Sequence, residues 1–273
     1  MNRRQIYIVM ALFCFVTLLF LAWNAPELPS TIDRSQRSLK PWEYWPLGTD
    51  MNGRPLIEYA TQGARVIAVP SFVAGTLVAF FGMVGGLIRC VEVPTLQAVV
   101  QFGGEIIGAL PRMVVILVVA LLLPMDWRSL MPLAIVWSIL CAPGAIDEAG
   151  AVAARLGGTR FVEALKAHGF GAWRIYIHHI VVLNLRPVLV RQGAEAMMTV
   201  AFLEVALSYL AVVEDQSSFT HSDNLRSWAD LLKEGYLWLA LGIDSSHVLF
   251  VGLGLLGLVV MTATAITKAA EAR

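Results

Sequence analysis

Few side chains in this 273-residue sequence have the type and spacing that chemistry requires. The adjacent imidazoles of His178 and His179 attract attention first, because neutral imidazole is a common metal ligand. Neighbouring residues on a helix point about 100° apart, however, so the pair would make a poor chelate. We therefore assign no role to His178 and expect His179 to brace a loop or an interface.

Glu204 is the second candidate, because this carboxylate lies inside a long apolar run. A carboxylate buried in a bilayer is costly unless it faces a cavity or a partner. Two interpretations stay open: a functional residue in a polar pathway or subunit interface, and a hydrogen-bonded brace. Arg191 and Glu195 stand four residues apart, and we interpret them as a structural pair along one helix face.

The sequence predicts no catalytic site. Catalysis needs a nucleophile, a base or a metal at workable geometry, and no such combination is apparent. A GxxxxGK[ST] phosphate-binding loop is also missing. Cys14, Cys90 and Cys141 are far apart and lack CxxC spacing, so we interpret them as packing residues. We expect no catalytic residue, metal or cofactor in this chain.

The composition is typical of a membrane protein. Hydrophobic residues make up 58% of the chain and charged residues 15%, whereas soluble domains have about 25% charged residues. The net charge is zero and no basic stripe is present, which argues against a nucleic-acid partner. We predict an all-α polytopic membrane protein with about six transmembrane helices, each long enough to cross a bilayer. The predicted spans are Ile6–Trp23, Val66–Ile88, Gly103–Pro124, Ser129–Ala145, Pro187–Val213 and Leu237–Thr262.

Basic residues near the predicted spans indicate the orientation. Arg3, Arg4 and Lys268 flank the two ends of the chain, and more basic residues lie in the segment 146–185. Because such residues accumulate on the cytoplasmic side, we expect both termini and this segment inside and the segment 24–65 outside. The first span could be a cleaved signal peptide, but its apolar run is longer than a signal core, so we expect it to be retained. We expect a kink at Pro111 in the third span and a helix stop at Pro143-Gly144.

The cytoplasmic segment from Arg160 to Ile180 has its own pattern, "RFVEALKAHGFGAWRIYIHHI". Apolar residues near helical spacing predict a short helix, Gly169 and Gly171 predict a break, and a second apolar run follows. Such a helix could dock its apolar side chains into a partner's groove. It could also be a connector that lies on lipid headgroups, and local features alone favour the connector.

A known pattern changes this balance. Glu163-Ala164, Gly169, Ile175 and His179 resemble the EAA loop of ABC importer permeases. The resemblance implies that this loop is a coupling helix that contacts ATPase subunits. The implied coupling residues are Arg160, Phe161, Val162, Glu163, Ala164, Leu165, Gly169, Ile175 and His179.

Two further blocks strengthen the resemblance. "WPLGTDMNGRPLIEYATQGARV" resembles the block before the second span in C-type permeases of the peptide/nickel importer family; its matching residues include Gly48, Thr49, Asp50, Gly53, Arg54 and Arg65. We interpret Asp50 and Arg54 as a local salt-bridged turn, with docking of an external protein as the alternative. "FLEVALSYL" and "SWADLLKEG" resemble two later elements of the family; the first of them contributes the pathway or interface candidates Glu204, Ser208 and Tyr209.

The sequence also departs from the family pattern. Asp147 and Gly150 stand where the family usually has arginines, and Val182 and Leu183 replace a usual Pro-Asn. These changes affect the coupling region, so they leave room for a non-transporting membrane scaffold. A secondary transporter is a further alternative, although it would be expected to show internal repeats.

The resemblance implies a domain division and a set of partners. Residues 1–65 would form an N-terminal helix and external segment, 66–262 the permease domain, and 263–273 a cytoplasmic tail. The chain would be one permease subunit of a bacterial inner-membrane importer for peptides or, alternatively, for nickel or metal-chelator complexes. Its implied partners are a homologous permease, two ATPase subunits that hold ATP and Mg, an external solute-binding protein and membrane lipid.

Overall fold

The computed structural model describes residues 3–26, 34–89, 94–124, 127, 129–155, 159–213 and 227–271. Over these residues the protein is all-α, as the sequence predicts, and the extended pairing is limited to an isolated bridge between Thr49 and Pro55. The elements are α1 (Arg3–Trp23), η1 (Arg34–Gln36), α2 (Leu56–Gly63), η2 (Ala64–Ala68), α3 (Val69–Ile88), α4 (Pro94–Gly108), α5 (Arg112–Leu122), α6 (Leu130–Arg155), α7 (Thr159–Ala167), η4 (Arg174–Leu185), α8 (Arg186–Val213), α9 (Trp228–Ala240) and α10 (Ser246–Glu271).

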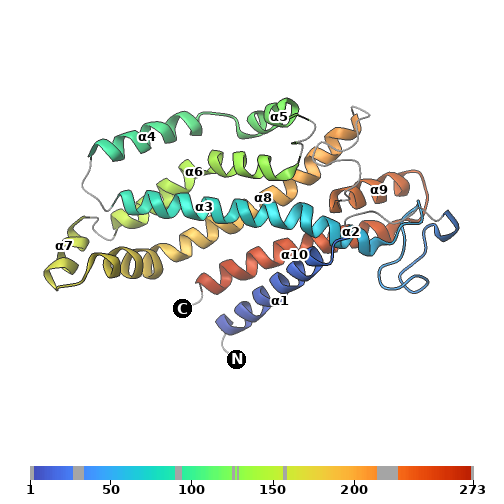
Figure 1. Ribbon diagram of the computed structural model, residues 1–273, viewed down its shortest axis with the longest axis horizontal. Coiled ribbons are helices and arrows are strands. Elements are labelled where there is room, and N and C mark those ends of the chain that lie inside the picture. The colour runs from blue at the N-terminus through green and yellow to red at the C-terminus, as the bar shows by residue number, and fades with distance from the viewer. Residues whose placement is uncertain are drawn as a thin grey trace.

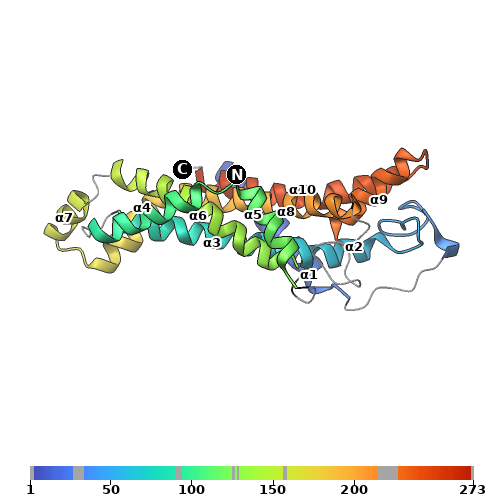
Figure 2. The same cartoon turned by 90° about the horizontal axis from the view of Figure 1, so that it is seen from above.

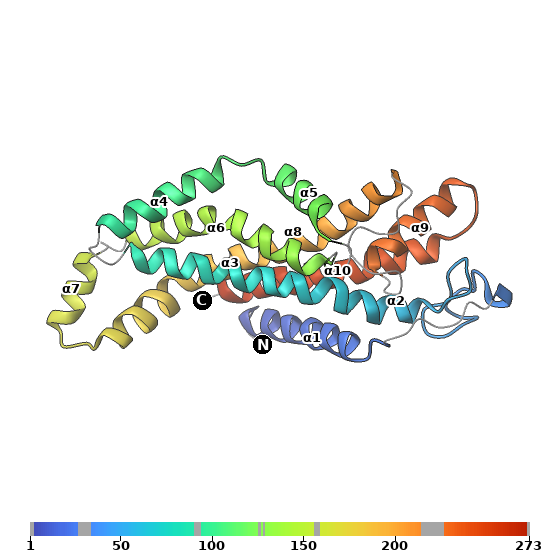
Figure 3. The same ribbon diagram turned by 45° about the horizontal axis from the view of Figure 1, so that its top comes forward.

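The helices form an elongated bundle (Figure 1). α3 packs between α6 and α8, while α10 packs on α1, α8 and α9. α7 lies at one end of the bundle, and α9 lies with the segment before α2 at the other end (Figures 1 and 2). The first residues of α1 and the last residues of α10 lie at the helix ends nearer to α7 (Figure 3).

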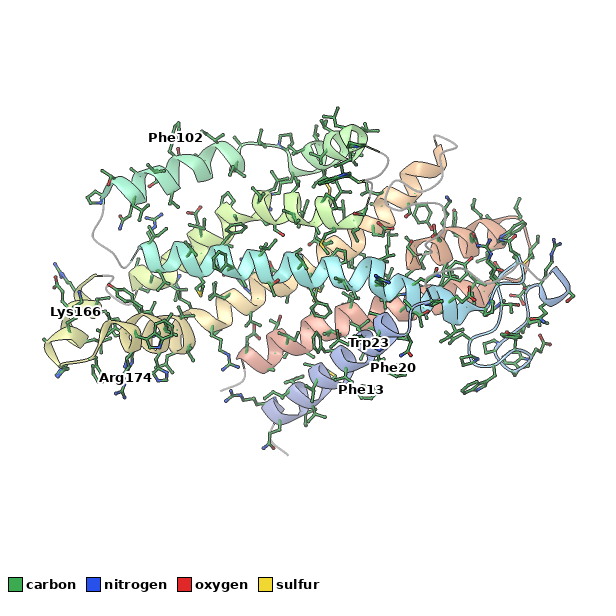
Figure 4. The ribbon with its side chains drawn as sticks, viewed as in Figure 1. Phe13, Phe20, Trp23, Phe102, Lys166 and Arg174 are labelled. Atoms are coloured by element: carbon green, nitrogen blue, oxygen red, sulfur yellow. The ribbon has the colours of Figure 1, made fainter. Side chains whose placement is uncertain are left out.

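Large apolar side chains cover the outside of this bundle. Phe13, Phe20 and Trp23 project from α1, and Phe102 projects from α4 (Figure 4). Exposing this surface to water would have a large free-energy cost, whereas lipid tails are as apolar as the surface itself. The chain is therefore an all-α polytopic membrane protein.

Four helical stretches of the described chain are long and apolar enough to span a membrane. They are α1, the continuous run Leu56–Ile88, α6 and α10, and the bent pair α4–α5 makes five if it counts as one span. The prediction of about six also counts α8, which is not among these stretches of the described residues. Glu204 of α8 is buried, and the helix packs on α3, α6 and α10.

The expected kink at Pro111 is confirmed, although the helix before it starts earlier than predicted. α4 begins at Pro94, and α4 and α5 meet at an angle of 77°. Pro111 is the extended residue before α5, with φ −70° and ψ 102°. Proline lacks the N–H that a continuous helix would need there.

The expected helix stop at Pro143-Gly144 is wrong, because α6 continues to Arg155 with Pro143 inside it. An interior proline costs about 3 kcal/mol, so other contacts must offset it. The glycines of α3 supply them: a Cβ at Gly82 would lie 3.3 Å from the Ala145 carbonyl oxygen, and one at Gly85 would lie 2.5 Å from Ile146. Close packing against α3 therefore holds α6 in helical form beyond the proline.

The predicted span Leu237–Thr262 corresponds to α10 but has the wrong bounds, because it contains the end of one helix and most of another. α9 ends at Ala240, Gly242 adopts a φ of +79°, and α10 begins at Ser246. A Cβ at Gly235 would lie 2.8 Å from the Leu249 backbone nitrogen, so the two helices fold back closely on each other. α10 then runs to Glu271, so the residues 263–271 of the predicted tail are helical.

Candidate functional site

The segment of the EAA-like pattern folds as a helix, a break and a second helix, as predicted. α7 ends in a Schellman arrangement: the Phe170 N–H donates to the Leu165 carbonyl over 3.2 Å and the Gly169 N–H donates to Lys166 over 2.9 Å. Gly169 adopts a φ of +82°, which glycine takes without steric cost. The segment is thus a defined corner at the end of the bundle, from which Lys166 and Arg174 project outward (Figure 4).

The apolar side of α7 faces the bundle. Val162 is 3% exposed, and it packs in a cluster with Ile175 and Ile180. The same cluster includes partly buried Phe161 and Leu165 of α7, Ala149 and Ala153 of α6, and Met83 and Leu87 of α3. The protein's own helices bury Val162 and partly cover Phe161 and Leu165, which disfavours the alternative that these side chains enter a partner's groove.

The outward face of the same segment is polar. Arg160, Glu163 and Lys166 are exposed on α7. Trp173, which we did not single out from the sequence, is 79% exposed beside them, and the Arg174 guanidinium carbon lies 5.0 Å from the centre of the Phe170 ring. A partner would therefore meet charges and one indole here. A sequence signal for this exposed residue was available, because Trp173 follows the glycine break closely.

His179 braces the break. Its ring packs edge-on against Phe170 with the ring centres 5.2 Å apart, and the Asn184 amide donates to the His179 carbonyl over 2.6 Å. His178 is exposed, and its ring centre lies 5.3 Å from that of His179. Among the described residues, no group of three or more His, Cys, Asp or Glu could hold a metal ion. Cys14 is buried, Cys141 is partly buried, and Cys90 lies outside the described residues.

The two departures at Asp147 and Gly150 lie together in the structure. Arg89, at the end of α3, reaches across to α6 and pairs with Asp147 over 3.9 Å. A Cβ on Gly150 would lie 3.0 Å from Cγ of Arg89, so glycine leaves the room that this arginine occupies. A guanidinium group from α3 thus lies against α6 where two α6 arginines would be usual in the family.

Glu204 and Ser208 lie on the inner face of α8. Glu204 is fully buried and Ser208 nearly so, one helical turn further on. Tyr209 is partly exposed and donates a hydrogen bond to the Leu232 carbonyl of α9 over 3.3 Å. Glu204 and Ser208 are thus covered by the subunit's own helices.

Arg191 pairs across helices, not along its own. Its guanidinium group and the Gln192 amide both contact the Glu148 carboxylate of α6, whereas Glu195 is exposed on α8. The predicted pair of Arg191 with Glu195 is therefore wrong. The sequence did not indicate Glu148 as the partner, because it lies far from Arg191 along the chain.

The block Trp45–Val66 contains a tight turn organised by Asp50. The buried Asp50 carboxylate accepts hydrogen bonds from the Arg54 N–H over 2.7 Å and from the Tyr59 hydroxyl over 2.6 Å. The predicted salt bridge between Asp50 and Arg54 is wrong in its chemistry, because the arginine contributes its backbone. Gly48 and Gly53 have positive φ values of 88° and 82°, which explains glycine at both ends of this turn.

Thr49 anchors the turn to other parts of the chain. Its hydroxyl donates to the Gln36 carbonyl over 2.5 Å, and its own carbonyl lies 3.1 Å from the His247 ring of α10. Arg65 is exposed within η2, whereas Gly63, two residues earlier, is buried. The Gly48–Arg54 turn and α7 lie at opposite ends of the bundle (Figure 1).

Two of the sequence blocks pack against each other. Trp228 is fully buried, and a Cβ on Gly63 would lie 2.2 Å from its ring. Ser227 and Asp230 form a capping box at the start of α9. The "GAR" and "SWADLLKEG" blocks thus contain matched surfaces of one interface between α2 and α9.

Comparison with known proteins gives one line of similarity. No protein-family model matches the chain. The chain is 26% identical over 192 residues to the probable D,D-dipeptide transport system permease protein DdpC of Escherichia coli (strain K12). The matched region covers 68% of this chain and 62% of that protein, so the chain spans less than two thirds of the relative's length. The comparison confirms the resemblance that the three sequence blocks carry: the chain is similar to a peptide-transport permease.

Proposed function

We propose that this chain is one permease subunit of an ATP-driven ABC importer for peptides in a bacterial inner membrane. The similarity to a dipeptide transport permease supports the class. The observation that carries the proposal is the α7 corner, which is tied to the bundle by its apolar face and presents a polar face outward. Such a corner suits a contact through which a partner moves the membrane helices.

The proposed partners follow from this class. Two ATPase subunits with ATP and Mg bind beneath α7, a homologous permease completes the pathway, and an external solute-binding protein delivers the substrate. Both termini and α7 are cytoplasmic in this arrangement. The chain itself has no catalytic role, and ATP hydrolysis belongs to the partners.

Coupling proceeds through the cluster beneath α7. ATPase closure presses on the exposed side chains of α7, and Val162 and Leu165 transmit the displacement to Ala149 of α6 and Leu87 of α3. Because interiors are close-packed, a displaced helix moves its neighbours. The bundle then changes between inward-facing and outward-facing states.

The test is co-purification of the full chain with candidate ATPases, together with peptide-stimulated ATP hydrolysis by the complex in liposomes. Glu163→Ala and Trp173→Ala remove exposed groups of the contact, so we expect both association and hydrolysis to fall about tenfold, the ratio that corresponds to about 1.4 kcal/mol. Trp127→Ala is the matched control, because Trp127 is 68% exposed and follows α5 at a distance in sequence from α7.

Unchanged association and hydrolysis in both α7 variants would overturn the coupling role. Association with an ATPase that no peptide stimulates would favour the scaffold. Stimulation by a nickel or metal-chelator complex, and by no peptide, would keep the importer class and replace the substrate.

A further inference from the structure

A charged cavity lies between the bent pair α4–α5 and α6. Its volume is about 480 Å³, within the 300–1,000 Å³ range of small-molecule sites. Residues from four helices line it: Arg89 at the end of α3, Glu105 in α4, Arg112 in α5 and Asp147 in α6. The cavity is open to the outside of the bundle, since Glu105 and Arg112 are both exposed. Ionisable groups at membrane depth are costly, and they mark substrate or ion pathways.

The four charges are not equivalent. Arg89 and Asp147 already pair with each other, and Gly150 leaves room for the arginine side chain. Arg112 donates to the Cys141 sulfur over 3.9 Å, and no carboxylate of the described part of the chain pairs with it. Glu105 accepts a hydrogen bond from Gln101 over 3.3 Å, and no cation pairs with it within the same described residues. Among the described residues, one guanidinium and one carboxylate of the cavity thus have no ionic partner.

The backbone around these two groups leaves room for a ligand. A Cβ at Gly108 or Gly144 would meet no atom within 4 Å, and one at Gly104 would meet only Pro143, at 3.7 Å. All three glycines line the cavity. Arg112 is also the first residue of α5, and the positive end of a helix dipole favours an anion beside it.

We propose that this cavity binds a short zwitterionic peptide, with Arg112 holding the terminal carboxylate and Glu105 holding the terminal ammonium group. Guanidinium groups bind carboxylates through two parallel hydrogen bonds, and a carboxylate accepts from an ammonium group. The volume suits a dipeptide more closely than a long peptide. This inference rests on the proposed function, since it names the substrate class and two residues that recognise it.

Binding to the purified full chain in lipid nanodiscs tests the cavity without any partner. The probes are radiolabelled alanyl-alanine, its C-terminal amide and its N-acetyl form. We expect the unmodified dipeptide to bind about tenfold more tightly than either blocked form. Arg112→Gln should remove the preference over the amide and keep the preference over the acetyl form, while Glu105→Gln should do the reverse.

Arg4→Gln and Glu271→Gln serve as charge-matched controls, because neither residue lines the cavity. Arg112→Lys should restore part of the preference for the free carboxylate, which a misfolded variant would not do. Equal binding of the three probes, or unchanged preferences in both variants, would overturn the inference. The proposed function has a separate test in the ATPase assay, so a cavity that fails in an active importer is distinguishable from a chain that is no importer.

Discussion

The indole nitrogen of Trp228 donates a hydrogen bond to the Ala60 carbonyl over 3.2 Å, although 168 positions separate the two residues. This bond joins α9 to α2 and puts the indole ring against Gly63. A Cβ on Gly63 would lie 2.2 Å from Cδ1 of the ring. Glycine is therefore the residue that fits at position 63, because the ring of Trp228 occupies the space that a side chain would need.

The first prediction concerns this contact. Gly63→Ala should lower the free energy of unfolding by about 1–3 kcal/mol, because overpacking forces the backbones apart. Thermal unfolding in detergent, followed by tryptophan fluorescence, measures the loss. Gly254→Ala is the control, since a Cβ there would meet nothing within 4 Å. Equal melting temperatures of the two variants would contradict the prediction.

A second prediction concerns the crossing of α3 and α8. A Cβ on Gly75 would lie 2.7 Å from the Gly193 carbonyl oxygen, and a Cβ on Gly193 would lie 2.7 Å from that of Gly75. Either alanine variant should destabilise the protein by about 1–3 kcal/mol. The double variant should lose less than the sum, because the first alanine already separates the helices. Strict additivity in thermal unfolding would show that the two glycines do not share one contact.

The glycine break after α7 gives a third prediction with an internal control. Gly169 has a φ of +82°, whereas Gly171 does not have a positive φ, and a Cβ at either would meet nothing within 4 Å. Gly169→Ala should destabilise the corner by about 1–2 kcal/mol, because the left-handed conformation is strained in L-residues. Gly171→Ala should have little effect. Hydrogen exchange of the α7 amides measures both, and similar exchange rates would refute a conformational role for Gly169.

The fourth prediction separates two carboxylates. Glu148→Ala removes the contacts that Arg191 and Gln192 make from α8, so it should cost about 1 kcal/mol for a partly exposed pair. Glu195→Ala should change the free energy of unfolding by less than about 0.5 kcal/mol, as is usual for an exposed residue. Thermal unfolding of both variants distinguishes the two, and a larger loss for Glu195→Ala would favour the pairing along α8.

The fifth prediction concerns pH. Hydrogen bonds from Ser246 and the nearby Lys40 ammonium group lower the pKa of Asp244 below its usual 3.8. The ionised form is therefore favoured in the folded protein, so its contribution is present above about pH 4 and is lost as the pH falls through the lowered pKa. Lys40 and Asp244 lie 3.5 Å apart and join the segment before α2 to the start of α10.

Hydrogen exchange of residues 38–56 checks this sign. Exchange should be similar at about pH 7 and pH 5, after correction for the intrinsic rate, and should rise near pH 3. In Asp244→Asn the exchange should be raised at all three values and show a smaller rise on acidification. A wild-type rise between the two higher values would contradict the assignment to Asp244.

Sequence reasoning succeeded where one local signal dominates. α1 is uniformly apolar, Pro111 lacks a backbone N–H, and Gly169 interrupts an amphipathic run, and each feature appears where the sequence predicts it. It failed at Pro143, because the packing of α6 on the glycines of α3 outweighs the local cost. Whether a side chain faces a neighbour depends on such distant packing.

The candidate site shows the same division. The motif predicted that residues near Glu163 form a helix before a break, and the structure has that helix. The sequence did not indicate that Phe161 and Val162 face the protein's own bundle, because α3 and α6 supply the covering residues. Nor did it indicate that Arg89 would pair with Asp147, because the two residues are far apart in the sequence and Arg89 belongs to none of the blocks that resemble the family.

The run from Leu56 to Ile88 is one continuous helix of 33 residues. Its length is about 50 Å, while the hydrocarbon core is about 30 Å thick. At one end Tyr59 holds the Asp50 turn, and at the other end Leu87 packs into the cluster beneath α7. This helix therefore connects the two ends of the bundle directly. In the proposed importer, a tilt imposed at α7 also moves the Asp50 turn at the opposite end.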